Sequence, residues 1–420
     1  MEADGRGAGL ARQAHRLVRP ARRQRRRARL GRARAPEWGR FKLGHTHPDY
    51  SNSGVLAVLA EAYAGAKKTR GLTVADLAAP ETAGFVASVE NTIVHYGKST
   101  GFFADKMIER GPAYLSAAVL YENLVIESYA KNPPFPLVAI YPVEGTFWSD
   151  HPYSVLDADW VGAEEREAAE LFLAFLKARP AQERALALGF RPGDPAIATT
   201  APIDAAHGVD PKQPSTLLEV PDAPVLQKLL ALWRENKKPA DVILVFDKSG
   251  SMRGAPLEQA KAGGKAFLDT LHDQDQVSLV FFDGTVYPPI GPSPLGPNRR
   301  DFATRIDQVY AEGGTAMYDA VAMAHASAAE RARTERDRIH AVVVMTDGMD
   351  ESSRSTSLDR LVGALGGDGD EAAVRVFTIG YGARADVSVL ARIAEAAKGA
   401  TASGDVQSIV SVFQDMGSFL

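Results

Sequence analysis

The sequence predicts an α/β protein in which a doubly wound, mostly parallel sheet follows a partial α/β domain. From Ala240 onwards, strand-like apolar runs alternate with amphipathic helical stretches. This alternation is typical of βαβ units around a parallel sheet. The run Val242–Phe246 has no polar residue, as expected for a strand buried on both faces. Oxygen-bearing side chains follow it, where a parallel sheet forms its binding crevice.

Composition limits the classes of function. A chain of 420 residues, 45% apolar and 24% charged, is long enough for two or three globular domains. It has no Cys, which excludes disulfides, zinc thiolates, iron–sulfur clusters and a cysteine nucleophile. Its apolar runs are much shorter than the roughly 18–20 residues that span a bilayer, so we expect no transmembrane segment.

Charge is unevenly distributed along the chain. Residues 1–40 carry thirteen Arg and three acidic residues, a net charge of +10, and the remainder carries −14. The acidic remainder does not favour a nucleic-acid partner. The Arg-rich tail has two interpretations. One is a basic arm for nucleic acid or anionic lipid. The other, which we favour because the tail has few large apolar side chains, is a disordered segment or a translated upstream stretch. It lacks the apolar region of a secretory signal peptide.

Residues 41–207 have the pattern of a folded domain. A polar turn, Ser51-Asn52-Ser53, precedes the first apolar helical run. These side chains are typical helix caps, and the helix N-terminus behind them is equally suited to an anion or carbonyl oxygen. Helical patterns are predicted at 55–64, 72–77, 83–96, 101–110, 112–129, 164–177 and 181–188, and a strand at 137–141.

Four passages in this domain point to a known family. They are GHTHPDYSNSG (44–54), YLSAAVLYENLVIESY (114–129), YPVEGTFWSDHPY (141–153) and LGFRPGDPA (188–196). Residues 41 to about 221 thereby resemble the later part of a two-lobed bacterial extracellular solute-binding protein, a periplasmic-binding-protein-like α/β fold. The resemblance implies an extracytoplasmic or membrane-associated protein.

The same resemblance implies a solute cleft on the second lobe. The residues that would line it are Ser51, Asn52, Ser53, Glu144, Thr146 and Trp148. The second lobe resembles a whole one, whereas the Arg-rich residues 1–40 stand where the family has its first lobe. We therefore expect solute capture only if that lobe is supplied, because such sites enclose most of the ligand surface.

Residues 208–239 are predicted to be a linker. Pro211, Pro214, Pro221 and Pro239 bracket one short helical pattern, 224–235. Proline-rich polar segments of this kind commonly join domains.

The last domain is predicted at residues 240–420. We expect strands at 241–246, 276–282, 341–346 and 374–380, with a shorter one at 285–287. Helices are expected at 257–271, 301–310, 316–333, 358–365, 387–397 and 406–416.

Three segments of this domain supply hard oxygen ligands. Asp247, Ser249 and Ser251 follow the first strand, Thr315 follows two glycines, and Asp347 follows the strand 341–346. Carboxylate and hydroxyl oxygens suit Mg²⁺, which takes six oxygens and keeps several waters. Among neighbouring residues, Asp283, Asp350 and Glu351 are interpreted as solvated loop residues; the alternative for Asp350 and Glu351 is that they border the site and tune the choice of partner. Lys248 occupies a variable position, where its charge either weakens metal affinity modestly or points to water.

Together these segments resemble a von Willebrand factor type A (VWA) domain, a Rossmann-like fold, with all five residues of its metal-ion-dependent adhesion site (MIDAS). The resemblance implies Mg²⁺ or Mn²⁺ whose open position takes an acidic residue of a partner protein. We therefore expect a metal-dependent protein-binding module of a bacterial surface or periplasmic protein. The alternative is solute capture for transport, with the VWA domain as a docking device. No enzyme is expected, because the sequence has neither a Gly-x-Ser-x-Gly elbow nor a phosphate-binding P-loop.

Overall fold

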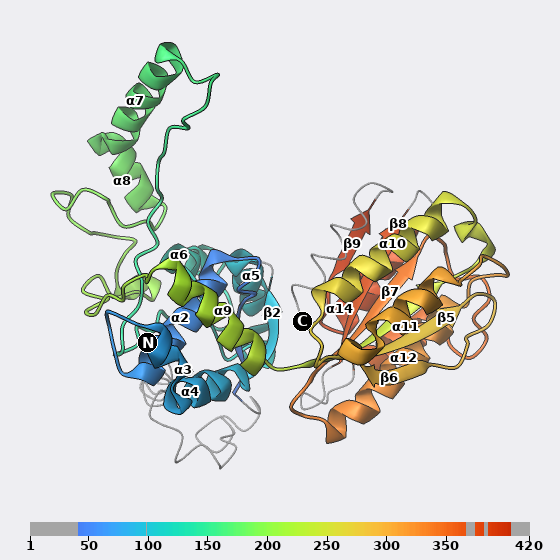
Figure 1. The fold of residues 1–420 in the computed structure, drawn as a ribbon. Coiled ribbons are helices and arrows are strands. Elements are labelled where there is room, and N and C mark those ends of the chain that lie inside the picture. Colours follow the sequence, from blue (N-terminus) through green and yellow to red (C-terminus); the bar gives the residue numbers. More distant parts are fainter. Residues whose placement is uncertain (1–40, 98, 367–373, 382–384, 405–420) are drawn as a thin grey trace. The chain divides into compact units, whose positions relative to one another are not determined.

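The computed structural model describes residues 41–97, 99–366, 374–381 and 385–404 (Figure 1). The Arg-rich residues 1–40 and the expected helix 406–416 lie outside them. The chain separates into two compact units, the first built mostly from residues 41–236 and the second mostly from residues 237–404. Every helix in these ranges falls short of the length and apolarity that crossing a bilayer requires.

The first unit is mainly helical. The three short strands before α6 form a sheet in the order β2–β1–β3, and α2 packs on α4 and β1. In chain order the elements are β1 (Leu43–Thr46), α2 (Asn52–Ala66), α3 (Val74–Ala78), α4 (Pro80–Glu90), β2 (Ile93–Gly97), α5 (Thr100–Arg110), η4 (Gly111–Ala113), β3 (Ala117–Ala118), α6 (Glu122–Ala130), α7 (Ala163–Lys177), α8 (Arg179–Ala187), η5 (Ala205–His207) and α9 (Ala223–Asn236).

Three predicted elements of this unit are wrong. The helix expected at 83–96 ends at Glu90, and Ile93–Gly97 is a strand, because β-branched and aromatic residues favour the extended backbone there. The helix expected at 112–129 divides into η4, β3 and α6. Residues 137–141 form no strand. Their backbone is held instead by a hydrogen bond of 2.8 Å from Ala139 N to Gly208 O.

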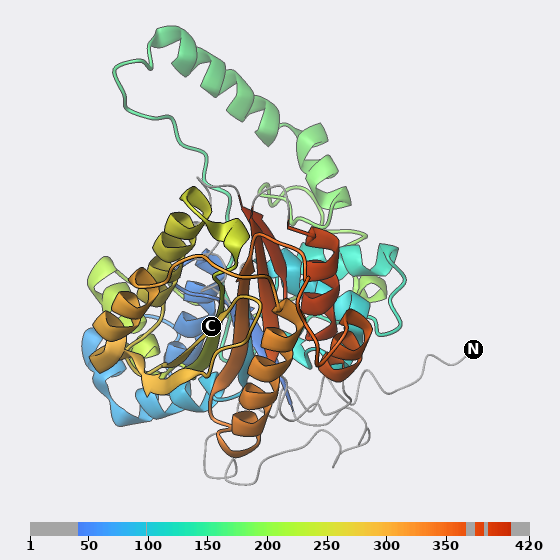
Figure 2. The ribbon, with the colours of Figure 1, turned by 90° about the vertical axis from the view of Figure 1, so that its right-hand side faces the viewer.

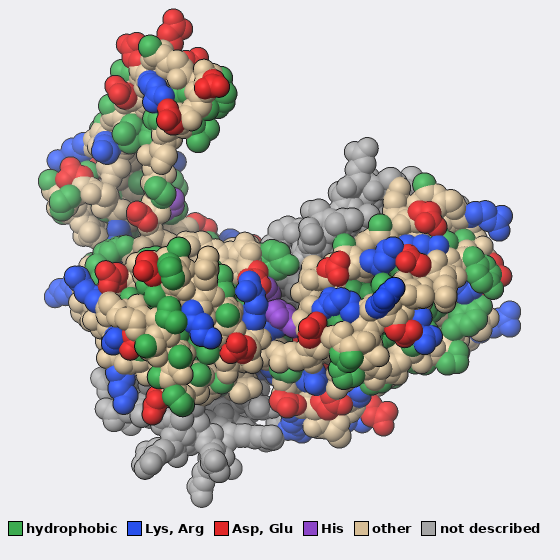
Figure 3. Space-filling model, viewed as in Figure 1, with side chains coloured by type: hydrophobic (Ala, Val, Ile, Leu, Met, Phe, Trp, Pro, Cys, Tyr) green, Lys and Arg blue, Asp and Glu red, His purple; other side chains and the backbone are tan. Residues whose placement is uncertain are grey.

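Two helices of the first unit differ in how they are packed. The helix expected in the linker, α9, packs against α2, α3 and α4 and buries Leu229 and Trp233 completely. By contrast, α7 has no buried residue, and Leu171, Phe172 and Phe175 are more than half exposed. Figure 3 shows hydrophobic side chains among charged ones along this segment.

The second unit is the predicted sheet with helices on both faces. The six strands have the order β6–β5–β4–β7–β8–β9; five are parallel and the edge strand β6 is antiparallel. Its elements are β4 (Ala240–Asp247), η6 (Gly250–Met252), α10 (Ala255–Thr270), β5 (Gln276–Phe282), β6 (Ile290–Pro294), α11 (Leu295–Asp307), α12 (Met317–Thr334), β7 (Ile339–Thr346), α13 (Leu358–Leu365), β8 (Arg375–Tyr381), α14 (Val387–Ala396) and β9 (Thr401–Gly404).

The sheet confirms the predicted fold class, with one strand misplaced. Residues 285–287 form only a bridge between Phe282 and Val286, and the edge strand lies at 290–294. Helices α12, α13 and α14 pack on one face, where Val245, Val344 and Val376 belong to the core. Helix α10 covers the opposite face, where Gly264 lies against Leu244 and Phe246. Figure 2 shows the helices on either side of the strands.

Candidate metal centre

The predicted metal ligands lie where the sheet reverses its winding direction. From β4 the chain continues to β5 on one side, and from β7 it continues to β8 on the other. The carboxyl ends of β4 and β7 therefore form the switch point at which open α/β sheets bind ligands. Asp247 is the last residue of β4, and Asp347 directly follows β7.

Backbone hydrogen bonds fix the ligand-bearing loops to each other. Gly250 N donates to Gly313 O at 3.0 Å, and Glu312 N donates to Lys248 O at 2.8 Å. Gly313 has a φ of +74°, a conformation that favours glycine. The loop after β4 and the loop before α12 are thus held together without any contribution from a ligand.

The side-chain oxygens of this centre are close enough to bond one another. Ser251 Oγ donates to Asp347 Oδ1 at 2.7 Å, and Ser249 Oγ lies 2.9 Å from Ser251 Oγ. Thr315 is adjacent, because a Cβ placed on Gly348 would lie 3.6 Å from both Thr315 Oγ1 and Ser251 Oγ. Four of the five residues are buried and Ser251 is partly exposed.

Two hydrogen bonds fix the orientation of the Asp247 carboxylate. Its Oδ1 accepts from Ser249 N at 2.7 Å and its Oδ2 from Thr346 Oγ1 at 2.6 Å. Burial raises the pKa of Asp247 to about 6, and the charge of Asp347 raises it further, whereas the hydrogen bonds from Ser249 and Thr346 lower it. A buried carboxylate whose pKa is raised lacks a compensating positive charge, which a nearby cation supplies. The part of Thr346 was missed from the sequence.

The donor set fits a hard divalent cation. It comprises two carboxylates and three hydroxyls, the oxygen chemistry that Mg²⁺ and Mn²⁺ prefer. When bound, such an ion supplies a Lewis-acidic position for an oxygen ligand from outside the chain.

Lys248 and Asp283 differ from their interpretation as solvated residues. Lys248 Nζ lies 2.5 Å from Asp283 Oδ2 and 3.0 Å from Glu312 Oε1. It also lies over the rings of Tyr287 and Tyr310, 4.6 and 5.2 Å from their centroids. Burial opposes the charged form, but the hydrogen bonds that Lys248 donates to Asp283 and Glu312 prevail and raise the pKa of Lys248. The lysine is therefore held away from water beside the metal-binding loop.

Asp350 has a structural role at the start of α12. Its Oδ1 accepts from Tyr318 N at 3.0 Å and from Ser353 Oγ at 2.5 Å. Both partners lie outside the predicted ligand set. Its carboxylate is thus not the solvated loop group expected from the sequence, whereas Glu351 is exposed, as expected.

The predicted solute-lining residues lie in two places in the first unit. Ser51 precedes α2 without capping it through its side chain; its Oγ lies 3.0 Å from Ser53 Oγ, which lies 2.7 Å from Thr46 Oγ1. Asn52 is exposed. Thr146 pairs with Leu217, and Trp148 stacks with Arg191 at 5.3 Å. Glu144 has a buried carboxyl oxygen. Within the described residues, no hydrogen bond joins the serine turn to residues 144–148.

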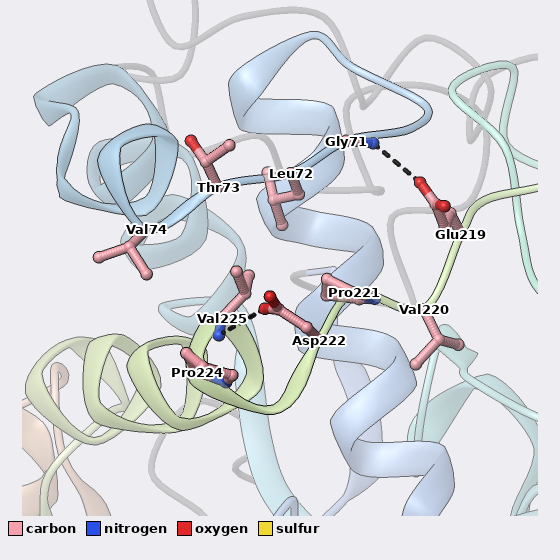
Figure 4. A pocket seen from close by; sticks show the side chains of 10 residues that line it. All are labelled: Gly71, Leu72, Thr73, Val74, Glu219, Val220, Pro221, Asp222, Pro224 and Val225. Atoms are coloured by element: carbon pink, nitrogen blue, oxygen red, sulfur yellow. Dashed lines mark hydrogen bonds between the residues drawn. The ribbon is translucent and has the colours of Figure 1, made fainter.

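A surface pocket in the first unit lies between the α2–α3 connection and the start of α9 (Figure 4). Its two carboxylates already have backbone partners. Glu219 accepts from Gly71 N at 2.9 Å, and Asp222 accepts from Val225 N at 3.3 Å. None of the predicted solute-lining residues belongs to this pocket.

Comparison with known proteins places the second unit in a family. Residues 241–415 match the model of the von Willebrand factor type A domain. An uncharacterised protein of Synechocystis is 31% identical over 165 residues, which cover 39% of this chain and 37% of that protein. Inter-alpha-trypsin inhibitor heavy chain H4 of Sus scrofa is 32% identical over 114 residues, covering 26% of this chain and 12% of that protein.

Among solved structures, a von Willebrand factor type A protein from Catenulispora acidiphila is 23% identical with a TM-score of 0.38. The match covers 43% of this chain and 42% of that one. The chain thus spans less than half the length of each of these three proteins. The family match over residues 241–415 and the doubly wound sheet of the described residues agree on one conclusion: this part of the chain contains a von Willebrand factor type A domain.

Proposed function

We propose that the VWA domain is a metal-dependent protein-binding module, in which Mg²⁺ or Mn²⁺ recruits an acidic residue of a partner protein. The observation that supports this most strongly is the meeting of oxygens from three separate segments at the switch point. The ligand set is Asp247, Ser249, Ser251, Thr315 and Asp347.

Each residue has a distinct part in this proposal. The hydroxyls of Ser249, Ser251 and Thr315 are neutral ligands, so they leave the ion with much of its positive charge. Asp247 and Asp347 supply negative charge, either directly or through water. With few anionic ligands from the chain itself, the remaining position favours a carboxylate from outside.

We propose a binding role and not a catalytic one. Hydrolysis at this metal would need a general base beside the metal-bound water. Asp350 lies three residues after Asp347, but its Oδ1 already accepts hydrogen bonds from Tyr318 N and Ser353 Oγ.

Manganese binding tests the metal part of the proposal. Titration of the full chain with Mn²⁺, followed by electron paramagnetic resonance, should give one tight equivalent that Mg²⁺ displaces. Asp247→Ala should remove it, because the buried charge of the site is lost. Asp269→Ala is the matched control, since Asp269 is an exposed acid of the same domain. Equal Mn²⁺ binding by Asp247→Ala would refute the site.

Acetate tests the carboxylate part separately. Acetate added to the Mn²⁺-loaded chain should displace metal-bound water and lower the relaxation enhancement of water protons, whereas acetamide, which has no charge, should not. If acetate has no more effect than acetamide while Mn²⁺ binds, the metal site stands and the acidic-partner proposal fails.

The cellular location of this module is part of the same proposal. The resemblance of residues 41–221 to extracellular solute-binding proteins supports an extracytoplasmic or membrane-associated location. Solute capture remains a prediction that depends on a first lobe, and the hydrogen bonds among Ser51, Ser53 and Thr46 do not favour it over helix-start packing.

A further inference from the structure

A second group of metal-binding side chains lies in the first unit, far in sequence from the VWA domain. His45 is on β1, Glu61 on α2, and Glu90 is the last residue of α4. One ligand atom of each lies within 4.8 Å of the others. His45 and Glu90 are fully buried.

The hydrogen bonding of His45 determines which nitrogen faces the group. Nδ1 lies 2.8 Å from the carbonyl oxygen of Thr46. A carbonyl can only accept, so Nδ1 carries the proton. In the neutral imidazole the lone pair is therefore on Nε2, which lies 3.1 Å from Glu90 Oε1. Metal-bound histidines commonly donate their other N–H to a carbonyl in this way.

Glu61 contributes an oxygen without a hydrogen-bond partner. Its Oε2 is buried, and no donor in the described residues reaches it. The site thus holds three electron-rich atoms from three elements at short range. Glu61 therefore needs either a proton or a nearby cation, because a buried carboxylate without compensation is costly.

We propose that His45, Glu61 and Glu90 bind a divalent transition-metal ion, with Zn²⁺ as the reference ion. A neutral imidazole and two carboxylates balance the ion's charge, so the buried site carries no net charge. The 3.1 Å between Nε2 and Oε1 is close to the roughly 3.3 Å between two ligands of a tetrahedral zinc with bonds of about 2.0 Å. The second oxygen of a carboxylate, or a water molecule, completes the coordination.

The ion's role would be structural. It joins β1, α2 and α4, elements that already pack together in the first unit. Imidazole with carboxylate ligands suits zinc better than magnesium, which prefers oxygen alone. The two metal sites of the chain would therefore differ in the ions they select.

The test isolates this site from the VWA domain. In the full chain with Asp247→Ala and Asp347→Ala, Zn²⁺ is titrated against a chromophoric chelator, and Co²⁺ is followed by its visible absorption. We expect one tight equivalent and a cobalt spectrum of low coordination number. Glu61→Gln should weaken binding by at least about 100-fold, since even loss of an outer-shell partner costs 10–100-fold.

Glu81→Gln is the matched control, because Glu81 is an exposed acid in the first turn of α4. It should bind as tightly as its parent. Thermal unfolding gives a second readout that does not depend on tight-binding titration: Zn²⁺ should raise the first unit's Tm in the parent and leave Glu61→Gln unchanged.

The opposite outcomes would overturn the proposal. If the parent binds no Zn²⁺ or Co²⁺ at one equivalent, or if Glu61→Gln binds like Glu81→Gln, the three side chains share protons and hold no metal. A Tm of Glu61→Gln above that of the metal-free parent, with no response to Zn²⁺ in either, would establish the protonated network.

Discussion

Thr315 gives the sharpest residue-scale test of the VWA metal centre. Thr315→Val removes one hydroxyl and keeps the shape of a buried side chain. We expect Mn²⁺ affinity to fall by at least about tenfold, which corresponds to about 1.4 kcal/mol of binding free energy, while Tm changes little. Isothermal titration and thermal unfolding measure the two effects.

Thr304→Val is the control for Thr315→Val. Thr304 Oγ1 donates to Arg300 O on the surface of α11, away from the metal centre. Mn²⁺ affinity should not change in this variant. An equal loss of Mn²⁺ affinity in both variants would contradict a specific role of Thr315 as a ligand.

Asp241 links stability to pH. Its carboxylate accepts from Arg331 at 2.8 and 3.1 Å and lies 2.8 Å from His340 Nδ1. Burial alone would raise the pKa of Asp241, but the hydrogen bonds from His340 and Arg331 lower it below its usual value of 3.8. A depressed pKa means that this stabilisation is complete above about pH 4 and is lost as pH falls through the folded-state pKa.

Asp241→Asn should therefore cost about 3 kcal/mol of unfolding free energy at pH 7, since it leaves Arg331 without its buried partner. The difference from the parent chain should shrink below pH 3.8. Urea unfolding at pH 7 and pH 3 measures it. A difference that is independent of pH would contradict a charge-based contribution.

At the residue scale, the sequence indicated which oxygens would meet but not what holds them. Asp247, Ser251 and Asp347 were identifiable because each follows a recognisable pattern. The hydrogen bond from Thr346 to Asp247 and the partners of Lys248 were not, because they depend on how side chains of neighbouring strands and loops face one another.

At the element scale, the loop before α12 depends on small residues. A Cβ on Gly314 would overlap Ser352 Oγ. Gly314→Ala should therefore destabilise the VWA domain by about 1–3 kcal/mol and weaken Mn²⁺ binding, because the same loop carries Thr315. Urea unfolding and Mn²⁺ titration are the measurements.

Ser352→Ala should restore much of what Gly314→Ala loses, since it removes the overlapping oxygen. Gly363→Ala tests whether the effect belongs to this loop: nothing lies within 4 Å of a Cβ there, and alanine is the better helix former by up to about 1 kcal/mol. That variant should be at least as stable as the parent. Failure of Ser352→Ala to rescue would contradict the overlap with Ser352 as the cause of the lost stability.

Elements with one strong periodicity were predicted well, and mixed segments were not. The expected strand 341–346 lies within β7, and the helix 358–365 matches α13. Residues 83–96 failed because no Gly or Pro separates α4 from β2; three polar residues, Glu90, Asn91 and Thr92, are all that stand between their apolar residues. The pairing partner of an edge strand such as β6 is likewise not encoded in its own few residues.

At the scale of the whole molecule, the two compact units should respond separately to core mutations. Trp233 of α9 is fully buried in the first unit, and Phe267 of α10 in the second. Trp233→Ala and Phe267→Ala should each cost about 3–5 kcal/mol in the unit that contains the residue. Differential scanning calorimetry should show each variant shifting a different transition.

Mg²⁺ identifies the transition that belongs to the VWA domain, because Mg²⁺ prefers an oxygen-only site and should raise only that one. If both variants lower the same transition, the two units unfold as one cooperative body.

The distance along the chain between the metal ligands has a consequence for the order of folding. Ser251 and Asp347 are 96 residues apart, and Asp247 and Thr346 are 99 apart. The strands that bring these residues together are separated by a similar length of chain, because Ala240 pairs with Ile339. The oxygens therefore meet only when β4 and β7 pair, and closing so long a loop is slow. An ion at the proposed site would not nucleate folding as structural zinc does in small domains. A newly synthesised chain would complete its sheet first and select its metal afterwards, from whatever ions its surroundings supply.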